Sequence, residues 1–249
     1  MTSPSAHAVR QYASSTGRLT ARMAIHAYGT NPQDWFSWLG ERLPLAGRVL
    51  EVGAGTGELW RRVRHDGLEL TLTDFSAAMC ARLASVPGAR VRRCVAGALP
   101  FVDGSFDTVV ANHMLYHVDD PAAALRELAR VLRPGGRIAV ATNGLAHMTE
   151  LRELGTRIGR PDLIAWRGFT AGNGPGLIAA AFSGVRVEEY PADLAVPSVA
   201  PILAYLGSMA DEPLTEAQVA AVEGIVAERI AADGVFRVRK HTVLMTATR

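Results

Sequence analysis

A run of small and acidic residues in the first quarter of the chain has the composition of a nucleotide-binding loop. Glycines stand at alternate positions, at Gly53, Gly55 and Gly57, and Glu51 stands two residues before the first of them. Because these positions carry no side chains, a ligand can lie directly against the backbone. A carboxylate beside such a loop repels a pyrophosphate and attracts an ammonium group. The run therefore predicts a site for a nucleotide-like ligand that carries a positive charge.

The residues on either side of this loop predict a strand that leads into it and a helix that follows it. Arg48–Val52 is apolar and β-branched, as in a buried strand, and Glu58–Arg64 reads as the start of a helix. Strand, glycine turn and helix form the first unit of a nucleotide-binding α/β sheet, in which free N–H groups of the helix face the ligand. The dinucleotide fingerprint requires the spacing G-x-G-x-x-G, and here the third glycine comes one residue early.

A second acid stands where the next predicted strand ends. The strand Glu69–Thr73 leads directly into Asp74. Ligands of doubly wound sheets bind at the carboxyl ends of strands, and a carboxylate can accept hydrogen bonds from both hydroxyls of a ribose. We expect Ser76 to cap the next helix, and Phe75 and Met79 to enclose an adenine ring. The competing interpretation is a helix-capping acid followed by ordinary core residues.

Four segments of the chain resemble one enzyme family. The run E-x-G-x-G-x-G resembles motif I of the class I S-adenosylmethionine (SAM)-dependent methyltransferases, and Asp74 to Met79 resembles their second motif. The string LPFVDGSFD, from Leu99 to Asp107, and the run Leu128–Ile138 resemble the ubiquinone-biosynthesis-like (methyltransferase type 11) group. The resemblance covers about Arg48 to Thr142, and it implies that the protein binds SAM and releases S-adenosylhomocysteine (SAH).

The resemblance also implies which residues hold the cofactor. In this group an Asp often stands five residues before the proline of the LPFVDGSFD string and binds the adenine amino group, whereas this chain has Val95 there. The backbone of Ala96 and Gly97 is then expected to bind the adenine edge, and the sulfonium is expected near Asn112. The implied cofactor-binding residues are Glu51, Gly53, Ala54, Gly55, Gly57, Asp74, Phe75, Ser76, Met79, Ala96, Gly97, Ala98 and Asn112, with Tyr12 and Arg22 reaching the SAM carboxylate from the N-terminal helix.

Histidines are the candidates for a general base. Methyl transfer from a sulfonium depends mainly on alignment and on the exclusion of water, and it needs a base only if the acceptor is protonated. His113 and His117 follow the fourth strand, His147 follows the fifth, and His26 lies in the N-terminal segment. A structural or surface histidine is the competing interpretation for each of them.

Strands and helices alternate along the chain, which predicts one doubly wound, Rossmann-like α/β domain over residues 1–249. The resemblance implies a seven-stranded sheet with an antiparallel last strand. The N-terminal helices of 9–44 and the insertions 143–181 and 198–233 are expected to form a cap over the acceptor site. The predicted strands are Arg48–Val52, Glu69–Thr73, Arg90–Val95, Thr108–Ala111, Arg137–Thr142, Val185–Tyr190 and Phe236–Thr248, and the main predicted helices are 9–25, 33–43, 58–64, 122–132, 198–207 and 215–232.

Composition limits the cellular locations and the kinds of partner that we expect for the protein. A formal net charge of +2 over 249 residues gives no sign of a nucleic-acid partner. Cys80 and Cys94 provide neither a metal spacing nor a disulfide framework, which favours a reducing compartment. The chain shows no apolar signal core and no run of the length of a membrane span. We therefore expect a cytoplasmic monomer or homodimer without a bound metal and without a nucleic-acid or membrane partner.

The leading hypothesis is a SAM-dependent methyltransferase that acts on a small, largely apolar metabolite, such as one of secondary metabolism. The apolar, Ala-rich character of the predicted cap favours such an acceptor. The alternative is a protein that uses SAM without methyl transfer, as a cyclase or rearrangement catalyst, and Val95 slightly favours it. A regulatory or scaffold module is a third hypothesis, against which the intact Glu51 and Asp74 argue. Nicotinamide binding is a fourth: Asp74 would suit it equally, but the glycine spacing would not.

Overall fold

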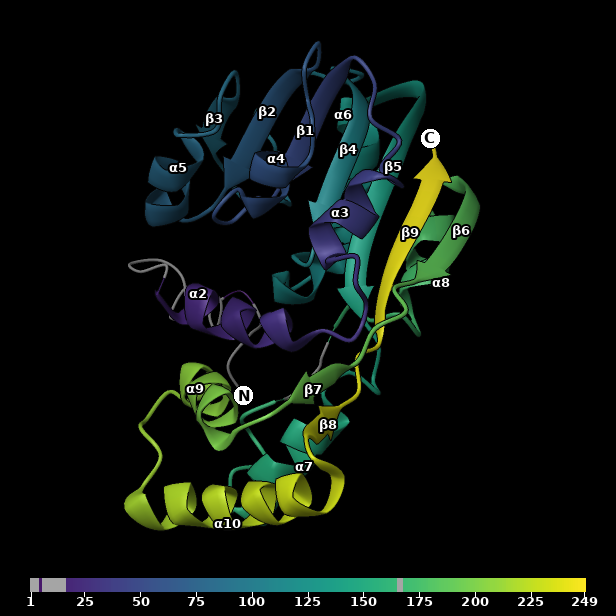
Figure 1. The fold of residues 1–249 in the computed structure, drawn as a ribbon. Helices are drawn as coiled ribbons and strands as arrows, with labels where there is room; N and C mark the ends of the chain where they lie inside the picture. The colour runs from purple at the N-terminus through teal and green to yellow at the C-terminus, as the bar shows by residue number, and fades with distance from the viewer. Residues whose placement is uncertain (1–4, 6–16, 165–167) are drawn as a thin grey trace.

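The computed structural model describes residues 5, 17–164 and 168–249, and its main feature is a seven-stranded sheet (Figure 1). The strand order is β3-β2-β1-β4-β5-β9-β6. Strands β1 to β5 are parallel, and β9 is antiparallel to both of its neighbours. The predicted α/β, Rossmann-like sheet with an antiparallel last strand is therefore confirmed. The strands are β1 (Arg48–Val52), β2 (Glu69–Asp74), β3 (Arg90–Arg93), β4 (Phe106–Asn112), β5 (Leu132–Asn143), β6 (Ser183–Glu189) and β9 (Thr242–Thr248).

Helices cover both faces of this sheet, which explains why its strands are apolar on both sides. In β1 the alternation is visible in single residues. Val49 packs in the core shared with α3 (Trp35–Gly40), α4 (Glu58–Arg62) and α5 (Ala77–Leu83). Its neighbour Leu50 packs in the core on the opposite face, beneath the helices α6 (Pro121–Val131) and α8 (Gly174–Ala179).

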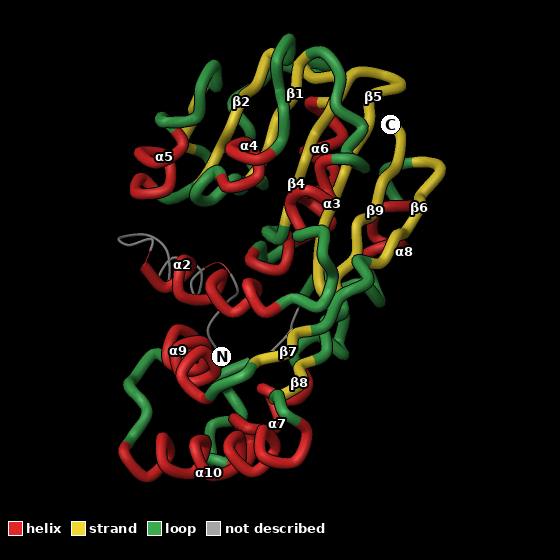
Figure 2. The backbone as a smooth tube through the Cα atoms, in the orientation of Figure 1, coloured by secondary structure: helices red, strands yellow, loops and turns green. Residues whose placement is uncertain are grey.

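A second group of elements lies beyond the carboxyl ends of the parallel strands, and we call it the cap (Figure 2). It has a hydrophobic core of its own, which includes Leu151, Leu206 and Val226. In Figure 1, α2 lies between the sheet and the remaining cap helices. The elements of the cap are α2 (Gly17–Ala24), η1 (Ile25–Tyr28), α7 (Thr149–Arg157), α9 (Val199–Met209), α10 (Glu216–Asp233), β7 (Leu194–Val196) and β8 (Phe236–Val238).

Local signals set several boundaries. The capping box of Thr215 and Gln218 begins α10, and Gly234 ends it in a left-handed conformation, as the sequence predicts. The predicted helix 33–43 is shorter, because the side chain of Asp34 accepts from the N–H groups of Phe36 and Ser37 and makes Trp35 the first helical residue. Within the predicted insertion 143–181, α7 joins the cap, whereas α8 packs against β6 and α6. Among the described helices, none combines the length and apolarity needed to cross a bilayer.

The prediction of one continuous strand over Phe236–Thr248 is wrong. The segment forms β8, which pairs with β7 in a small antiparallel sheet, and β9, which belongs to the main sheet. Between them, side chains of the cap and of neighbouring segments accept hydrogen bonds from three successive backbone N–H groups. These donors are satisfied without a neighbouring strand, so the chain can pass from one sheet to the other. The acceptors are Glu150 Oε2 for Arg239 (2.8 Å), Asp193 Oδ1 for Lys240 (2.9 Å) and His147 Nδ1 for His241 (3.1 Å).

Candidate cofactor and acceptor site

The three glycines of the first loop differ in their surroundings. All have positive φ, of 69° at Gly53, 58° at Gly55 and 80° at Gly57. A Cβ atom at Gly53 would lie 2.7 Å from the Cβ of Met114, and one at Gly57 would lie 3.0 Å from core side chains. At Gly55 the nearest atom is Cδ2 of Leu19, at 3.6 Å, an ordinary contact. Packing thus requires glycine at the first and third positions, and Gly55 is the position open to a ligand on the side of α2.

Asp74 connects the first loop to the second. Its Oδ2 accepts a hydrogen bond of 3.0 Å from the N–H of Gly55, and its Oδ1 accepts one of 2.8 Å from the N–H of Ser76. Burial raises the pKa of this carboxyl group. Ser76 caps α5 by accepting from the N–H of Met79 (3.3 Å), which confirms the predicted cap. Each carboxylate oxygen keeps a second lone pair, so the ribose contact stays a prediction.

Glu51 is buried near the carboxyl end of β1, with a partner that the sequence did not reveal. Its Oε2 accepts a hydrogen bond of 2.5 Å from Nε1 of Trp60, which α4 places above the loop. Burial, together with the negative charge of Asp74, raises the pKa of Glu51 to about 8. The carboxyl group is therefore largely protonated near neutral pH, and a cation placed beside it would favour ionisation. Its contact with the SAM ammonium group stays a prediction.

The residues predicted to bind adenine lie at the ends of β2 and β3. Met79 is buried, and Phe75 and Leu19 of α2 are partly buried and pack against it. After β3, Ala96 is buried, whereas Gly97 and Ala98 are exposed. They lie in a turn that is closed by a hydrogen bond of 3.1 Å from the Ala98 N–H to the Val95 carbonyl oxygen. The Val95 side chain is 57% exposed. Ala54 extends the edge of the site, because its N–H bonds to the carbonyl of Thr73 (2.9 Å).

Asn112 and His113 follow β4 at the same edge of the sheet. Oδ1 of Asn112 is buried without a hydrogen-bond partner among the described residues. A buried amide oxygen in this state is costly unless a ligand or water supplies a donor. His113 has a φ of 55°, an uncommon conformation for a residue other than glycine, and it lies 5.3 Å from Trp35 between ring centroids. An orphan acceptor next to a strained residue fits a ligand at this strand end.

Three of the four predicted histidines, His26, His113 and His147, lie close enough to Lys240 for its positive charge to affect their pKa. Burial and the charge of Lys240 lower the pKa of His113 to about 3, and burial together with the charges of His26 and Lys240 lowers the pKa of His147 well below its usual value. His147 is buried and holds the linker before β9, whereas the His26 side chain is exposed, where water screens the charge. Protonation is thus most costly at His147 and His113. Neutral rings can accept a proton, but a pKa this low makes them weak bases.

The remaining predicted residues are placed apart from these. His117 lies in the 3-10 turn η2 (Leu115–His117), with its ring 4.5 Å from that of Tyr116. Nη2 of Arg22 donates to the carbonyl oxygen of Ser208 in α9 (2.9 Å), which gives it a partner other than the predicted SAM carboxylate. Tyr12 lies outside the described residues. Within the part of the chain that the structure describes, no cluster of His, Cys, Asp or Glu has an arrangement suited to a metal ion.

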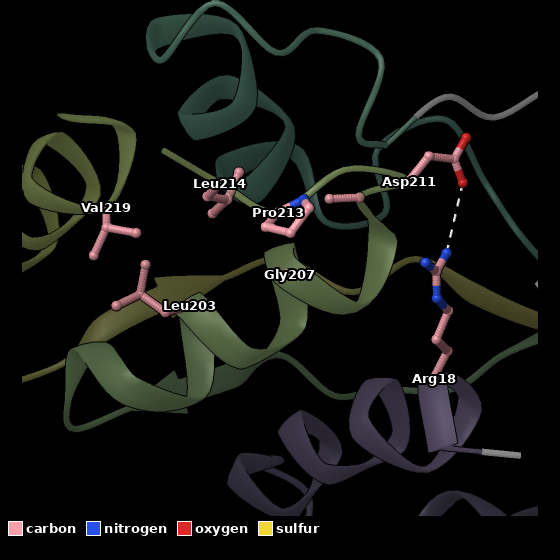
Figure 3. Close-up of a pocket in the computed structure, with 8 residues that line it drawn as sticks. Arg18, Leu203, Gly207, Asp211, Pro213, Leu214 and Val219 are labelled. Atoms are coloured by element: carbon pink, nitrogen blue, oxygen red, sulfur yellow. Dashed lines mark ion pairs between the residues drawn. The ribbon is translucent and has the colours of Figure 1, made fainter. Parts of the chain in front are cut away.

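A second contact joins α2 to the rest of the cap. Arg18 forms an ion pair of 3.5 Å with Asp211, beside a cavity of about 340 Å³ between α2, α9 and α10 (Figure 3). Leu203, Leu214 and Val219 line the apolar part of this cavity. The cavity lies within the cap, and it is separate from the residues predicted to bind SAM.

Sequence reasoning missed several residues that the structure places at the site. Leu19, Trp60 and Trp35 contact predicted site residues from other elements, and such pairings leave no local signal in the sequence. Lys240 had one signal that could have been used: it is the only lysine in a chain whose other basic residues, apart from histidines, are arginines.

The sheet order and its loops define a class of protein. A glycine loop after β1, an acid after β2 and an antiparallel strand between β5 and the edge strand together form a Rossmann-like fold of the SAM-binding type. Residues 50–140 match the sequence model of a family described as a methyltransferase domain. Residues 50–140 of the chain are thus similar to a methyltransferase domain.

Curated relatives with methyltransferase names match the chain over part of their length. The chain is 38% identical over 131 residues to a demethylmenaquinone methyltransferase of Beutenbergia cavernae, a match that covers 50% of this chain and 47% of the relative. The chain thus spans about half the length of the curated relatives it matches.

Solved structures share the fold at lower identity. A SAM-dependent methyltransferase of Thermotoga maritima, described as a possible histamine N-methyltransferase, superposes with a TM-score of 0.59 at 18% identity over 98% of this chain and 99% of that one. Phosphoethanolamine N-methyltransferase 2 of Haemonchus contortus, solved with SAH, gives a TM-score of 0.61 at 18% identity over 100% of this chain and 60% of that one. At such identity these likenesses show the fold alone.

Proposed function

We propose that the protein transfers a methyl group from SAM to a small-molecule acceptor. The observation that carries the proposal is the 3.0 Å hydrogen bond from the Gly55 N–H to Asp74, which joins the glycine loop to the acid at the carboxyl edge of the sheet. Both residues lie inside the segment that matches a methyltransferase domain. A diol acceptor and an open glycine backbone at one edge suit an adenosine with a charged tail.

The same edge offers groups for each part of the cofactor. When bound, SAM supplies a methyl group made electrophilic by its positively charged sulfur. In our proposal the loop Gly53–Gly57 and Glu51 hold its methionine part, and Asp74 accepts from the ribose. Phe75, Ser76, Met79 and the turn 96–98 surround the adenine. The buried and unpartnered Oδ1 of Asn112 supports this arrangement, since it needs a donor that a ligand can provide.

The acceptor is proposed to lie between the end of β4 and the cap. Trp35 and Tyr116 flank the ring of His113, with centroid distances of 5.3 Å and 6.3 Å, and they offer apolar surface to a small metabolite. His117 is the residue proposed to take a proton from an acceptor that carries one, because the low pKa of His113 makes that ring a weak base. The cap would exclude water from the transfer. A role in secondary metabolism stays a prediction from the sequence.

Calorimetry with SAM and SAH tests cofactor binding directly, and folded protein that gives no heat at millimolar ligand would contradict the proposal. Transfer is tested by incubating the protein with methyl-labelled SAM and a metabolite extract, with the Asp74→Ala variant as control. We expect a labelled product together with an equal amount of SAH. If SAM binds and a metabolite is converted without SAH, the cofactor serves a cyclisation or rearrangement and the alternative holds.

A further inference from the structure

Lys240 is a buried cation without an anionic partner. It lies in the linker between β8 and β9 and is 8% exposed, with its backbone N–H bonded to Asp193 Oδ1 (2.9 Å). Its Nζ stands 4.7 Å from the centroid of the Tyr190 ring, a cation–π contact. Within residues 5, 17–164 and 168–249, no oxygen accepts a hydrogen bond from Nζ and no carboxylate is within ion-pair distance. Lys240 borders a cavity, so an anion can reach it.

The surroundings of Lys240 concentrate its positive charge. Burial lowers its pKa to about 8, against the opposing effect of Asp193, so the group remains mostly protonated near neutral pH. Among the described residues, Lys240 is the only group other than a histidine whose charge contributes to the lowered pKa of His26, His113 and His147. The ring of His113 is neutral, and it can donate one hydrogen bond to an anion without adding charge. A single positive charge with neutral donors suits a singly charged anion better than a phosphate.

Two further features connect Lys240 to the transfer site. The Tyr190 ring, against which Lys240 lies, is 5.4 Å from that of Trp35. Nε1 of Trp35 is a buried donor without an acceptor among the described residues. An anion bound there would supply that acceptor. Trp35 in turn contacts His113, the neighbour of Asn112. The unpartnered groups therefore extend from Lys240 to the strand end where the methyl donor is proposed.

We propose that Lys240 binds a carboxylate carried by the methyl acceptor. The inference rests on the proposed function, and it assigns the acceptor to the class of small carboxylic acids with an apolar body. Lys240 also lines a cavity of about 310 Å³, whose rim includes Glu189 and Asp193. Both acids are exposed, so solvent screens their repulsion of a ligand, while the buried ammonium group is screened much less.

The sole lysine makes a direct test possible. Lysine labelled with ¹³C at Cε gives a single side-chain signal in the 249-residue chain, because Lys240 is its only lysine. We would titrate this signal, at saturating SAH, with acetate, benzoate and 2-naphthoate, and with the neutral benzamide and 2-naphthamide. We expect a saturable shift with at least one carboxylate and binding at least about tenfold weaker for its amide, because charge-assisted hydrogen bonds are the stronger ones. If no carboxylate moves the signal, or if the amides move it equally, the proposal is wrong.

Variants of Lys240 provide a second test of the proposal. Lys240→Met and Lys240→Gln should each lose the preference for carboxylate over amide in calorimetry, while SAM binding stays within about twofold of the native protein because Lys240 lies outside the cofactor loops. Arg64→Met is the matched control, since Arg64 is 93% exposed and removes the same charge. Equal carboxylate binding by native protein and a folded Lys240 variant would overturn the assignment. Loss of SAM binding by the native protein would instead refute the proposed function, and the lysine titration would remain interpretable.

Discussion

Cδ2 of Leu19 lies 3.6 Å from the position that a Cβ atom would take at Gly55. The same side chain packs against Met79, so one residue of α2 contacts two of the segments that are proposed to hold SAM. On that helix, Arg18 and Arg22 bond to Asp211 and to the carbonyl oxygen of Ser208. The helix therefore links the cap to the cofactor loops, and its side chain occupies space over the glycine at which a ligand has access.

Leu19 should control how fast SAM enters. Leu19→Ala removes the contact with Met79, so less apolar surface must be exposed when α2 moves aside. We expect a severalfold higher association rate constant for SAM in stopped-flow fluorescence and a lower one for Leu19→Trp. Thr20→Ala changes an exposed residue of the same helix and should leave the rate unchanged. Equal rates for the two Leu19 variants would show that this side chain does not obstruct the site.

Gly53 should be the least replaceable glycine of the loop for stability. An added Cβ would lie 2.7 Å from Met114 Cβ, an atom that moves only with its backbone, at a φ of 69°. Gly67→Ala is the matched control, because its φ is 79° and nothing lies within 4 Å of the added atom. The control should lose about 1–2 kcal/mol of unfolding free energy from the backbone alone, and Gly53→Ala at least about 1 kcal/mol more from overpacking. Urea denaturation of both variants measures the difference, and similar losses would remove the role of Met114.

Asp74→Asn should weaken SAM binding at least about tenfold, because charge-assisted hydrogen bonds contribute roughly 1.5–3 kcal/mol each. Asp74 now accepts hydrogen bonds from the N–H groups of Gly55 and Ser76, and the amide NH₂ of asparagine would face one of these donors without accepting from it. Calorimetry with SAM measures the affinity, and thermal unfolding of the same samples reports any loosening of the loops. Asp66→Asn, at an acid that is 84% exposed, is the control. If both variants bind SAM within about twofold of each other, the ribose does not contact Asp74.

Glu51 should make the protein less stable as the pH rises. Its pKa is raised from 4.5 to about 8 in the folded state, so between these values the folded protein holds a proton that the unfolded chain has released. The free energy of unfolding then falls with rising pH, by at most about 1.4 kcal/mol per pH unit from this group. Glu51→Gln keeps an oxygen for Trp60 and has no proton to lose. Denaturation from about pH 5 to pH 8 should show the native protein losing stability relative to the variant, and parallel curves would contradict the raised pKa.

The parts of the fold that the sequence predicted depend on local signals. Strand β1 and the glycine loop follow from a short apolar run and its spacing, and α10 follows from Thr215, Gln218 and Gly234. Asp74 was located correctly at the end of β2, because the loops of a parallel sheet gather at one edge. Such features need only a few consecutive residues.

The parts that it did not predict depend on contacts between distant segments. The break between β8 and β9 requires acceptors from Glu150, Asp193 and His147, which no window around residues 239–241 contains. For the same reason, the sequence could suggest four histidines but could not show that three of them share the charge of Lys240. The hydrogen bond of Glu51 likewise depends on Trp60, which lies on a helix that begins after the loop.

The position of β9 sets an order in which the sheet can be completed. It pairs with β5 on one side and β6 on the other, although β6 precedes it in the chain. During synthesis, β6 therefore has no neighbour in the sheet, and β5 presents an open edge, until residues 242–248 arrive. The chain between β5 and β9 runs over residues 144–241, whereas that between β1 and β4 runs over 53–105, so pairing β9 with β5 closes the longer loop and is the slower step. The nascent protein should accordingly bear an unpaired strand edge up to the last stage of folding, which makes this interval the one in which it is most exposed to aggregation.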